Sequence, residues 1–278
     1  MAGSADPEDK SSRRRTRESG SFVRDTPGSR SLSRGLLLLR AFRGGITALS
    51  NAELAAFSGL PRSTVSRLTR TLVDAGFLDY HIASATYRLG PPLWTLGANV
   101  RSGARILKLA LPHMRGVADR LSTNVGLAVE DWGDMVYLDS IRRNRLGLFR
   151  RALPGMRIPV AETALGRAWL AALDEHDRQA SLRLLSRRYG DDWPPLATQI
   201  RASIAQVDEA GWCEAKYRQG ELISMAMPLR LPGLRVHALN LSYPVDSAHR
   251  QDVYASELLA LGKGLVEAFT HETARTGA

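Results

Sequence analysis

Hydrophobic residues recur at helical spacing in the first third of this 278-residue chain, and the pattern then changes to a mixture of helical and strand-like segments. Two apolar stripes in the first third predict amphipathic helices with one buried face each. The residues concerned are Leu32, Leu36, Leu39 and Phe42 in the first stripe, and Val65, Leu68 and Leu72 in the second.

Helix start and stop signals lie between the two stripes. Ser50 and Glu53 form a capping box, which predicts a helix that begins at residue 51. Ser58-Gly59-Leu60 ends that helix, and Pro61 presets the backbone for the first turn of the next one. Gly76 is placed to cap this last helix. The pattern therefore predicts two helices joined by a tight turn, preceded by a third.

Two short strands are expected next, at residues 77–80 and 86–89, around a turn at about residues 82–85. Three helices followed by a β-hairpin predict a winged helix. In a helix-turn-helix the N-terminal part of the second helix enters the major groove of DNA.

The face opposite the second stripe carries short hydroxyls and long guanidiniums, which bond phosphates and base edges. An ordinary amphipathic helix with a solvated polar face has the same pattern, and this alternative stays open at the level of the helix alone. The candidate DNA-binding residues on this helix and the hairpin are Arg62, Ser63, Thr64, Ser66, Arg67, Arg70 and Arg88.

The charge balance favours DNA as a partner. Residues 29–90 hold eight arginines against three acidic residues, a net charge of +5, and the whole chain carries +10 with a pI near 10.3. Arginine outnumbers lysine 34 to 4, which suits phosphate and base recognition but also fits a GC-rich genome. A basic balance gives salt-dependent affinity for DNA of any sequence.

Composition excludes several other classes. Residues 1–28 are rich in Ser, Arg, Gly and Asp, which predicts a disordered basic tail. No run of about 18 apolar residues indicates a membrane span, and the N-terminal region lacks the apolar stretch of a signal peptide. We therefore expect a cytoplasmic, nucleoid-associated protein. Cys213 is the single cysteine, so it forms no intramolecular disulfide, and we expect it to be a small buried hydrophobe.

Catalytic signatures are missing from the sequence. The six histidines have no metal-ligand spacing, and the chain contains no Gly-x-Ser-x-Gly elbow, phosphate loop or dinucleotide fingerprint. We therefore expect no catalytic residue, no metal site and no cofactor.

The remainder of the chain predicts an α+β domain with an antiparallel sheet covered by helices on one or both faces. Pro91-Pro92 ends the hairpin, a linker helix follows, and a second helix is expected from Pro112 to Leu121. The linker stripe at Leu93, Leu96, Val100 and Leu107 predicts a homodimer contact. Strands are expected at residues 125–129, 135–138, 212–215, 224–229 and 237–242, with a turn at residues 131–134 between the first two. Helices are expected at 164–173, 178–185, 196–210 and 251–270, and Thr163 can cap the first of them.

These segments divide the chain into five parts. The expected boundaries are a tail at 1–28, a winged helix-turn-helix domain at 29–91, a linker helix at 92–108, an effector-binding domain at 109–271 and a C-terminal tail at 272–278.

Motifs along both halves resemble the isocitrate lyase regulator (IclR) family of bacterial transcription factors. The resemblance covers roughly residues 30–270 and rests on the order and spacing of its motifs together. These are Arg34-Gly-Leu-Leu-Leu-Leu, Glu53-Leu-Ala, Ser58-Gly-Leu-Pro-Arg-Ser-Thr-Val-Ser-Arg-Leu, Gly76-Phe-Leu, Tyr87-Arg-Leu-Gly90, Met135-Val-Tyr-Leu, Gly155-Met-Arg-Ile-Pro159, Thr163-Ala-Leu-Gly-Arg-Ala168, Gly211-Trp and Ala238-Leu-Asn-Leu-Ser242.

The resemblance implies a winged helix, a linker helix and a GAF-like effector domain, in dimers or tetramers on near-palindromic operators. It implies an effector that is a small carboxylate or an aromatic acid. It places a carboxylate at the backbone amides of Ala164 and Leu165, a helix start with unpaired donors. Asn240 and Ser242 match the polar pair of the family's pocket. Its walls are matched by Arg150, Ile158, Ala215, Ile223 and Met225.

Three positions depart from the family pattern. Ala161-Glu162 stands where a histidine is common before the helix, Ala215 replaces a frequent acid, and Arg150 replaces a smaller or apolar residue. These departures bear on which effector binds.

The sequence therefore favours a DNA-binding transcriptional regulator controlled by a small molecule. Two alternatives remain at this level. One is an enzyme of small acids tethered to DNA by the winged helix, and the other is an architectural DNA-binding protein without a ligand.

Overall fold

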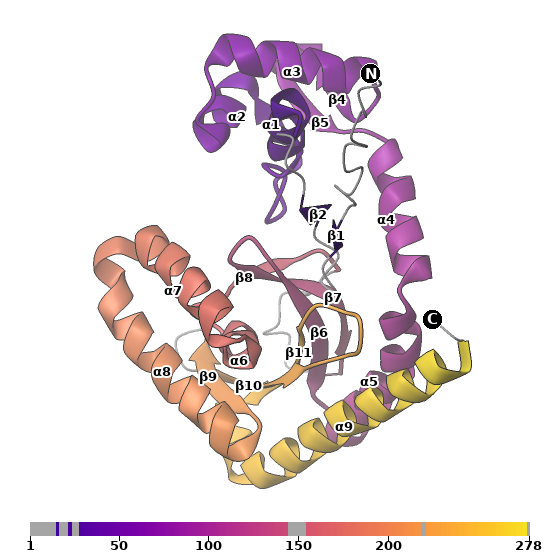
Figure 1. Ribbon diagram of the computed structural model, residues 1–278, viewed down its shortest axis with the longest axis vertical. Helices are drawn as coiled ribbons and strands as arrows, with labels where there is room; N and C mark the ends of the chain where they lie inside the picture. The colour runs from indigo at the N-terminus through magenta and orange to yellow at the C-terminus, as the bar shows by residue number, and fades with distance from the viewer. Residues whose placement is uncertain (1–14, 17–21, 24–27, 144–153, 218–220, 277–278) are drawn as a thin grey trace, which may run out of the picture.

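The computed structural model describes residues 15–16, 22–23, 28–143, 154–217 and 221–276. An N-terminal helical domain and a larger C-terminal domain are joined by one rod-like helix, α4, along one side of the molecule (Figure 1). Of the predicted tail, the structure describes residues 15–16, 22–23 and 28, and the two pairs form two short antiparallel strands, β1 (Arg15–Thr16) and β2 (Phe22–Val23).

The N-terminal domain is a winged helix, as the sequence predicts. Its three helices enclose a small core around Leu38, Leu54 and Val65, and a three-stranded sheet in the order β3-β5-β4 forms the wing. The elements are α1 (Arg30–Leu39), β3 (Leu49–Ser50), α2 (Asn51–Ser58), α3 (Arg62–Asp74), β4 (Leu78–His81) and β5 (Thr86–Leu89).

The predicted helix signals of this domain are confirmed. The Ser50 hydroxyl accepts a hydrogen bond from Glu53 N–H, and the Glu53 carboxylate accepts one from Ser50 N–H at 2.7 Å. Gly59 and Gly76 have φ of 67° and 73°, the left-handed conformation that ends a helix without strain in glycine.

The predicted core face of α1 is wrong in part. Leu32 and Leu36 are 63% and 52% exposed, whereas Leu38 is fully buried. Four consecutive leucines, 36 to 39, supply an apolar residue to every face of the helix, so the sequence pattern does not single out the buried one.

The linker consists of two helices, α4 (Pro92–Gly103) and α5 (Arg105–Leu121), which meet at Ala104. Ala104 has an extended backbone with φ −74° and ψ 94°, so the hydrogen-bond ladder is interrupted there. The prediction of a helix start at Pro112 is wrong, because Pro112 lies inside α5. Leu107 is 5% exposed in the core of the C-terminal domain and does not belong to the exposed linker stripe.

The C-terminal domain is built on a six-stranded antiparallel sheet in the order β8-β7-β6-β11-β10-β9. The turn predicted at residues 131–134 joins β6 to β7, with Trp132 and Gly133 at φ 55° and 74°. The strands are β6 (Asn124–Asp131), β7 (Asp134–Arg142), β8 (Arg157–Pro159), β9 (Cys213–Tyr217), β10 (Leu222–Leu229) and β11 (His237–Pro244). β3 and β8, two and three residues long, are absent from the sequence-based prediction.

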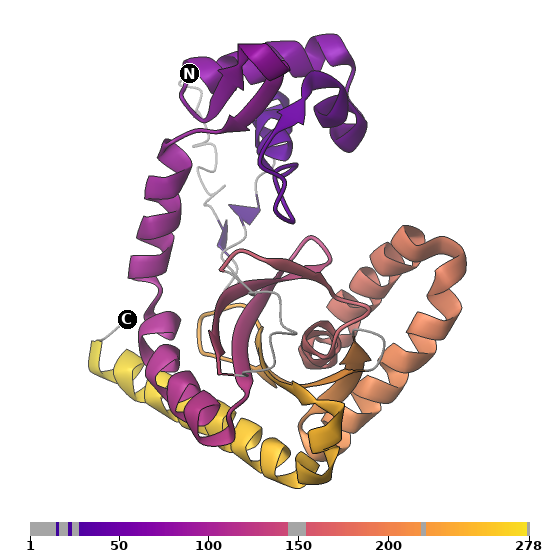
Figure 2. The ribbon, with the colours of Figure 1, turned by 180° about the vertical axis from the view of Figure 1, so that it is seen from behind.

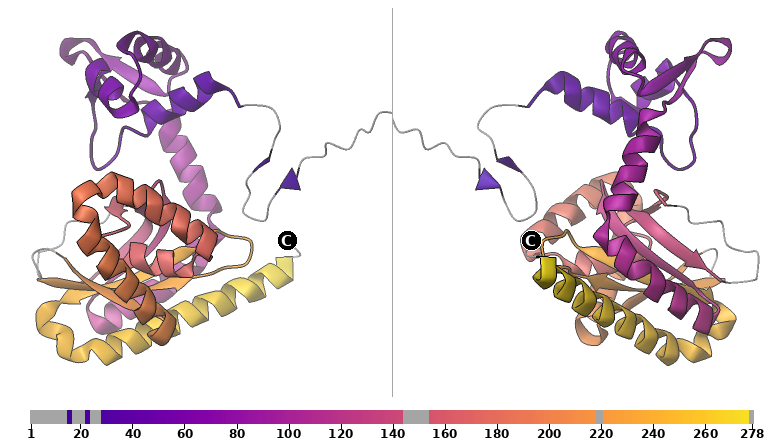
Figure 3. Two further views of the ribbon diagram at one scale, coloured as in Figure 1. Left: turned by 60° about the vertical axis from the view of Figure 1, so that its left-hand side comes forward. Right: turned by 90° about the vertical axis from the view of Figure 1, so that its right-hand side faces the viewer.

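Helices cover both faces of this sheet (Figures 1 and 2). One face packs on α5 and α9 (Gln251–Thr276) through a core that includes Leu127, Met225 and Leu241. The other face packs on α6 (Ala164–Ala172), which is buried along its whole length beneath α7 (Glu175–Tyr189) and α8 (Trp193–Ala210) (Figure 3). No helix among the described residues combines the length and the hydrophobicity that a bilayer span requires.

Candidate DNA-binding surface and ligand pocket

The second helix of the helix-turn-helix, α3, has one buried and one exposed face. Val65 and Thr69 are fully buried, and the Thr69 hydroxyl donates a hydrogen bond to Val65 O at 3.0 Å. Leu68 and Leu72 pack against the same core. Because this face holds the helix against α1 and α2, the opposite face points outward along its length.

The exposed face of α3 carries the residues that the sequence analysis selected. Arg62, Ser63, Ser66, Arg67 and Arg70 are exposed, and Thr64 is half-buried. The Ser66 hydroxyl accepts a hydrogen bond from the Asn51 side chain at 2.9 Å, which fixes it against α2. Within the described part of the chain, the arginines of this face form no ion pair.

The wing provides a second exposed edge. Arg88 lies on β5 opposite Asp79 on β4. The wing tip, residues 82–84, is held by side chains, since His81 Nδ1 lies 2.9 Å from Ser84 Oγ and Ser84 Oγ lies 2.8 Å from Thr86 Oγ1. Ile82 at the tip is 85% exposed. Ile82 is not among the surface residues that the sequence analysis selected. An isoleucine inside a predicted turn was nevertheless a signal for its exposure.

The start of α6 is a capped helix N-terminus that packs on the sheet. Thr163 caps it, because its hydroxyl accepts a hydrogen bond from Gly166 N–H at 3.3 Å. The amides of Ala164 and Leu165 belong to the first turn and so have no intrahelical acceptor. Cys213 Sγ donates to Ala164 O at 3.6 Å, which places this turn over β9.

A buried polar cluster lies on the face of the sheet that α6 covers. Asn240 donates from Nδ2 to Ser224 Oγ at 3.1 Å and to Ser242 Oγ at 2.9 Å. These three residues are between 3% and 8% exposed. Asn240 Oδ1 is buried with no hydrogen-bond partner in the described part of the chain. A buried acceptor of this kind is ready to receive a donor from a bound molecule.

Gly126 makes room for this cluster. A Cβ atom at Gly126 would lie 2.5 Å from Asn240 Oδ1 and 2.5 Å from Tyr137 Cε1. Burial raises the pKa of Tyr137 far above its usual value, and the Tyr217 hydroxyl adds to this, while the Arg142 charge and a hydrogen bond from Asn240 act in the opposite direction. Tyr137 therefore stays a neutral phenol beside Asn240.

The structure brings most of the predicted pocket residues to this face, but two lie elsewhere. Ala215 belongs to the core under α6, and Ile158 packs against that core. Ile223 and Met225 face α5 and α9 instead, which corrects their grouping with Asn240. Side chains alternate along a strand, so an assignment displaced by one residue moves a side chain to the opposite face. Arg150 lies outside the described residues.

Sequence reasoning missed Ser224 and Tyr137 in this cluster. Ser224 was detectable, because it lies between Ile223 and Met225 and pairs with Ser242 across β10 and β11. Tyr137 had no such signal, because its face of the sheet depends on its pairing with β6. A β-bulge between Leu127 and Ala128 shifts that pairing by one residue. No group of three or more histidine, cysteine or acidic side chains that could hold a metal ion lies within the ranges that the structure describes.

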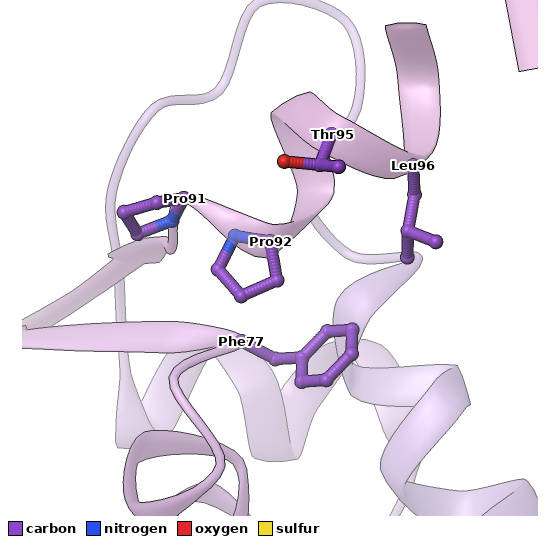
Figure 4. A pocket seen from close by; sticks show the side chains of 5 residues that line it. All are labelled: Phe77, Pro91, Pro92, Thr95 and Leu96. Atoms are coloured by element: carbon purple, nitrogen blue, oxygen red, sulfur yellow. The ribbon is translucent and has the colours of Figure 1, made fainter. Parts of the chain in front are cut away.

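A shallow apolar pocket lies where the wing meets the linker (Figure 4). Phe77 points toward Pro92, and Leu96 from the next turn of α4 closes the same side. On the same helix, Trp94 and Val100 are 83% and 73% exposed. The linker therefore presents large apolar side chains to solvent, which indicates a surface for association.

Comparisons with known proteins agree with this architecture. The family model described as the IclR helix-turn-helix domain matches residues 31–81. The model described as the bacterial transcriptional regulator IclR C-terminal domain matches residues 98–264.

Three relatives illustrate the similarity. The chain is 30% identical to the Pca regulon regulatory protein of Pseudomonas putida, over 84% of this chain and 80% of that protein. It is 30% identical to the transcriptional regulator TsaQ1/TsaQ2 of Comamonas testosteroni, over 70% of each. A crystal structure of an IclR family transcriptional regulator from Brucella abortus superposes with a TM-score of 0.81 at 30% identity, covering 88% of this chain and 94% of that one.

Proposed function

This chain belongs to the IclR family of bacterial transcriptional regulators, and we propose that it reads a near-palindromic operator as a homo-oligomer whose DNA affinity a small carboxylate controls. It is a DNA-binding regulator with an effector domain, as its relatives are. The proposal concerns the residues, the assembly and the ligand through which it acts in the cytoplasm.

The exposed face of α3 is the proposed reading surface. Arg67 and Arg70 lie on it with Ser63 and Ser66, and an arginine at this place can form two hydrogen bonds to a guanine. Arg62 and Thr64 at the helix start, and Arg88 on the wing, are proposed to contact phosphates, which set the position of the domain on the duplex.

A homodimer is proposed to form through α4. Trp94, Leu96 and Val100 are all at least half exposed in the single chain, and burial of such side chains by a second copy is favourable. Two winged helices held together in this way present two α3 helices to the two halves of an inverted repeat. Association of two such dimers gives the tetramer that is the other possible assembly.

The single observation that carries the ligand proposal is the buried cluster of Asn240, Ser242 and Ser224 on the face of the sheet that the Thr163-capped helix α6 covers. A helix N-terminus attracts an anion, and the Asn240 carbonyl oxygen has a free lone pair for a donor. A small carboxylate is therefore proposed to bind the amides of Ala164 and Leu165 and to contact the polar cluster. Ile158 and Ala215 are proposed as its apolar walls.

Control of DNA binding follows from differential affinity. A ligand that binds one arrangement of the two domains better than another shifts the population toward the first by that difference. Catalysis is not part of the proposal: the relatives are transcriptional regulators, and the polar cluster places two serines next to an amide rather than next to a base.

A thermal-shift screen of small organic acids on the full chain tests the ligand site. An acid that binds raises the unfolding temperature by mass action, and Ser242→Leu is expected to abolish this shift because the leucine fills the cluster. An active acid that stabilises both proteins equally would place the ligand elsewhere.

A footprint on the region upstream of its own gene tests the regulatory role. We expect a discrete protected site whose occupancy changes with the active acid. An enzyme would leave no discrete footprint, and an architectural protein would protect DNA without any response to the acid.

A further inference from the structure

Asn124 is a buried amide without a partner. It is the first residue of β6 and only 5% exposed, yet neither Nδ2 nor Oδ1 has a hydrogen-bond partner in the described part of the chain. An unsatisfied buried polar group destabilises a folded protein, so its presence in a folded core requires an explanation. A ligand that occupies the adjoining space supplies one.

The register of the sheet places Asn124 in a row of polar residues. Asn124 pairs with Ser242 on one side and with Arg142 on the other, and Ser242 pairs in turn with Ser224. Residues opposite each other on neighbouring strands share a face of the sheet. Their chain neighbours Val125 and Ile141 pack into the other core, beside α5, so this row faces α6.

Arg142 brings a positive charge to one end of this row. Its Nε and Nη1 atoms are buried, and its charge acts on the buried phenol of Tyr137 next to Asn240. The half-buried side chain therefore lies along the same face of the sheet as the polar cluster.

The start of α6 lies toward the other end of the sheet. Ala164 O contacts Cys213 on β9, and Arg142 lies on β7, so β6, β11 and β10 run between the two positions. With about 4.8 Å between neighbouring strands, the backbones that carry the two positions are separated by four strand spacings. The pocket therefore offers two separate positions for negative charge.

We propose that Arg142 and Asn124 form a second, cationic end of the ligand pocket, which selects an elongated ligand with an acidic group at each end. This rests on the ligand pocket proposed above. One carboxylate binds at the α6 amides and the other at Arg142, where Asn124 Nδ2 donates a further hydrogen bond. The ligand class is a dicarboxylate whose middle part crosses Ser242 and Asn240.

Matched acids test the second end. Isothermal titration of the full-length protein compares adipate with hexanoate, and terephthalate with benzoate. In hexanoate a methyl group replaces the second carboxylate of adipate, and in benzoate a hydrogen atom replaces that of terephthalate. We expect the wild type to bind one diacid at least about tenfold more tightly than its monoacid, as a charge-assisted pair with arginine implies. Arg142→Met is expected to remove that preference, with a much larger loss of affinity for the diacid than for the monoacid.

Asn124→Leu separates ligand binding from folding. Because the amide has no partner in the described structure, its replacement by an apolar side chain of similar volume is expected not to lower the unfolding temperature of the free protein. The same variant is expected to lose several-fold in diacid affinity. Arg143→Met is the control, since Arg143 is half-exposed and pairs with Asp119 on the surface.

The outcomes distinguish this inference from the proposed function. Equal affinity of wild type for diacid and monoacid, or a diacid preference that survives Arg142→Met, overturns the second end while the pocket stands. Binding of a monoacid that survives Ser242→Leu overturns the pocket itself. Failure of every acid in both pairs to bind the wild type overturns the inference and the carboxylate class together.

Discussion

Arg40 donates from both terminal nitrogens to the two carboxylate oxygens of Asp131, at 2.8 and 2.9 Å. Arg40 ends α1 in the N-terminal domain and Asp131 ends β6 in the C-terminal domain, so this pair joins the domains directly. The guanidinium also lies 4.4 Å from the ring centroid of Trp132. Asp131 in addition accepts from Arg157 Nη1 at 2.6 Å, which links the contact to the strand that leads into the Thr163 cap.

The Arg40–Asp131 contact predicts a pH-dependent stability. Burial raises the pKa of Asp131, but the hydrogen bonds and charges of Arg40 and Arg157 lower it further, so the folded pKa lies below the ordinary value. A depressed carboxyl pKa stabilises the fold above the unfolded pKa of about 4 and loses this contribution as the pH falls through the folded pKa. Asp131→Asn should therefore destabilise by roughly 1 kcal/mol at neutral pH and hardly at all in acid. Thermal unfolding measured across pH checks this. The control is Asp119→Asn, which should destabilise less at neutral pH because Asp119 and its partner Arg143 are both about half exposed.

Arg67→Ala is expected to weaken specific operator binding by about 1–3 kcal/mol, because the side chain is exposed on the outward face of α3. Gel-shift titrations on operator and scrambled DNA at one salt concentration measure the effect. The control is Arg183→Ala, which removes the same charge from an exposed position on α7. Equal losses of affinity for both DNAs would make Arg67 a phosphate contact. No loss of affinity would contradict the placement of α3 in the major groove.

Trp94→Glu is expected to dissociate the homodimer, because it places a charge in an apolar contact around Val100. Sedimentation velocity at micromolar concentration should show the wild type as a dimer or larger and the variant as a smaller species. Leu184→Glu makes the same change at a 67% exposed leucine on α7 and serves as the control. A wild type that sediments as a monomer contradicts the assembly.

Gly126→Ala is expected to destabilise the effector domain by about 1–3 kcal/mol and to abolish acid binding. The new methyl group would lie 2.5 Å from both Asn240 Oδ1 and Tyr137 Cε1, so the polar cluster must move. Gly264→Ala, at an exposed site on α9 with open space around it, should instead stabilise by roughly 0.5–1 kcal/mol. Chemical denaturation of the two variants measures both values, and a neutral Gly126→Ala would show that the cluster is loosely packed.

Cys213 is expected to be inert to thiol reagents in the folded protein. Burial raises the pKa of its thiol to about 12, and the thiolate is the reactive form. Ellman's reagent at neutral pH should therefore react slowly with the native chain and quickly after denaturation. Rapid reaction of the native protein would indicate that the start of α6, whose Ala164 carbonyl the thiol contacts, opens readily.

Signals that act over a few residues were readable in the sequence. The capping box of Ser50 and Glu53, the glycine at 59 and the β6–β7 turn depend on local backbone conformation, and each is where the pattern predicts it. The wing, the sheet and the Thr163 cap follow from the same kind of evidence.

Features fixed by distant partners were not readable. The three residues of β8 have no pattern of their own and become a strand by pairing with β7. Pro112 looks like a helix start, yet α5 continues through it because Met114 and Val117 are buried against α9 and the sheet. Ile223 and Met225 are apolar on a strand, but which face they occupy depends on the register with β11.

The interruption of the helix at Ala104 lies between the DNA-binding half of the chain and the effector domain. Every proposed DNA contact lies before this residue, and every residue of the proposed ligand pocket lies after it. Because no helical ladder continues through Ala104, a chimaera joined there need not preserve a helix phase across the junction. Fusing residues before 104 to the effector domain of a relative would therefore give a regulator with this protein's operator and another protein's inducer, which makes Ala104 a natural crossover point for recombination between paralogous regulators.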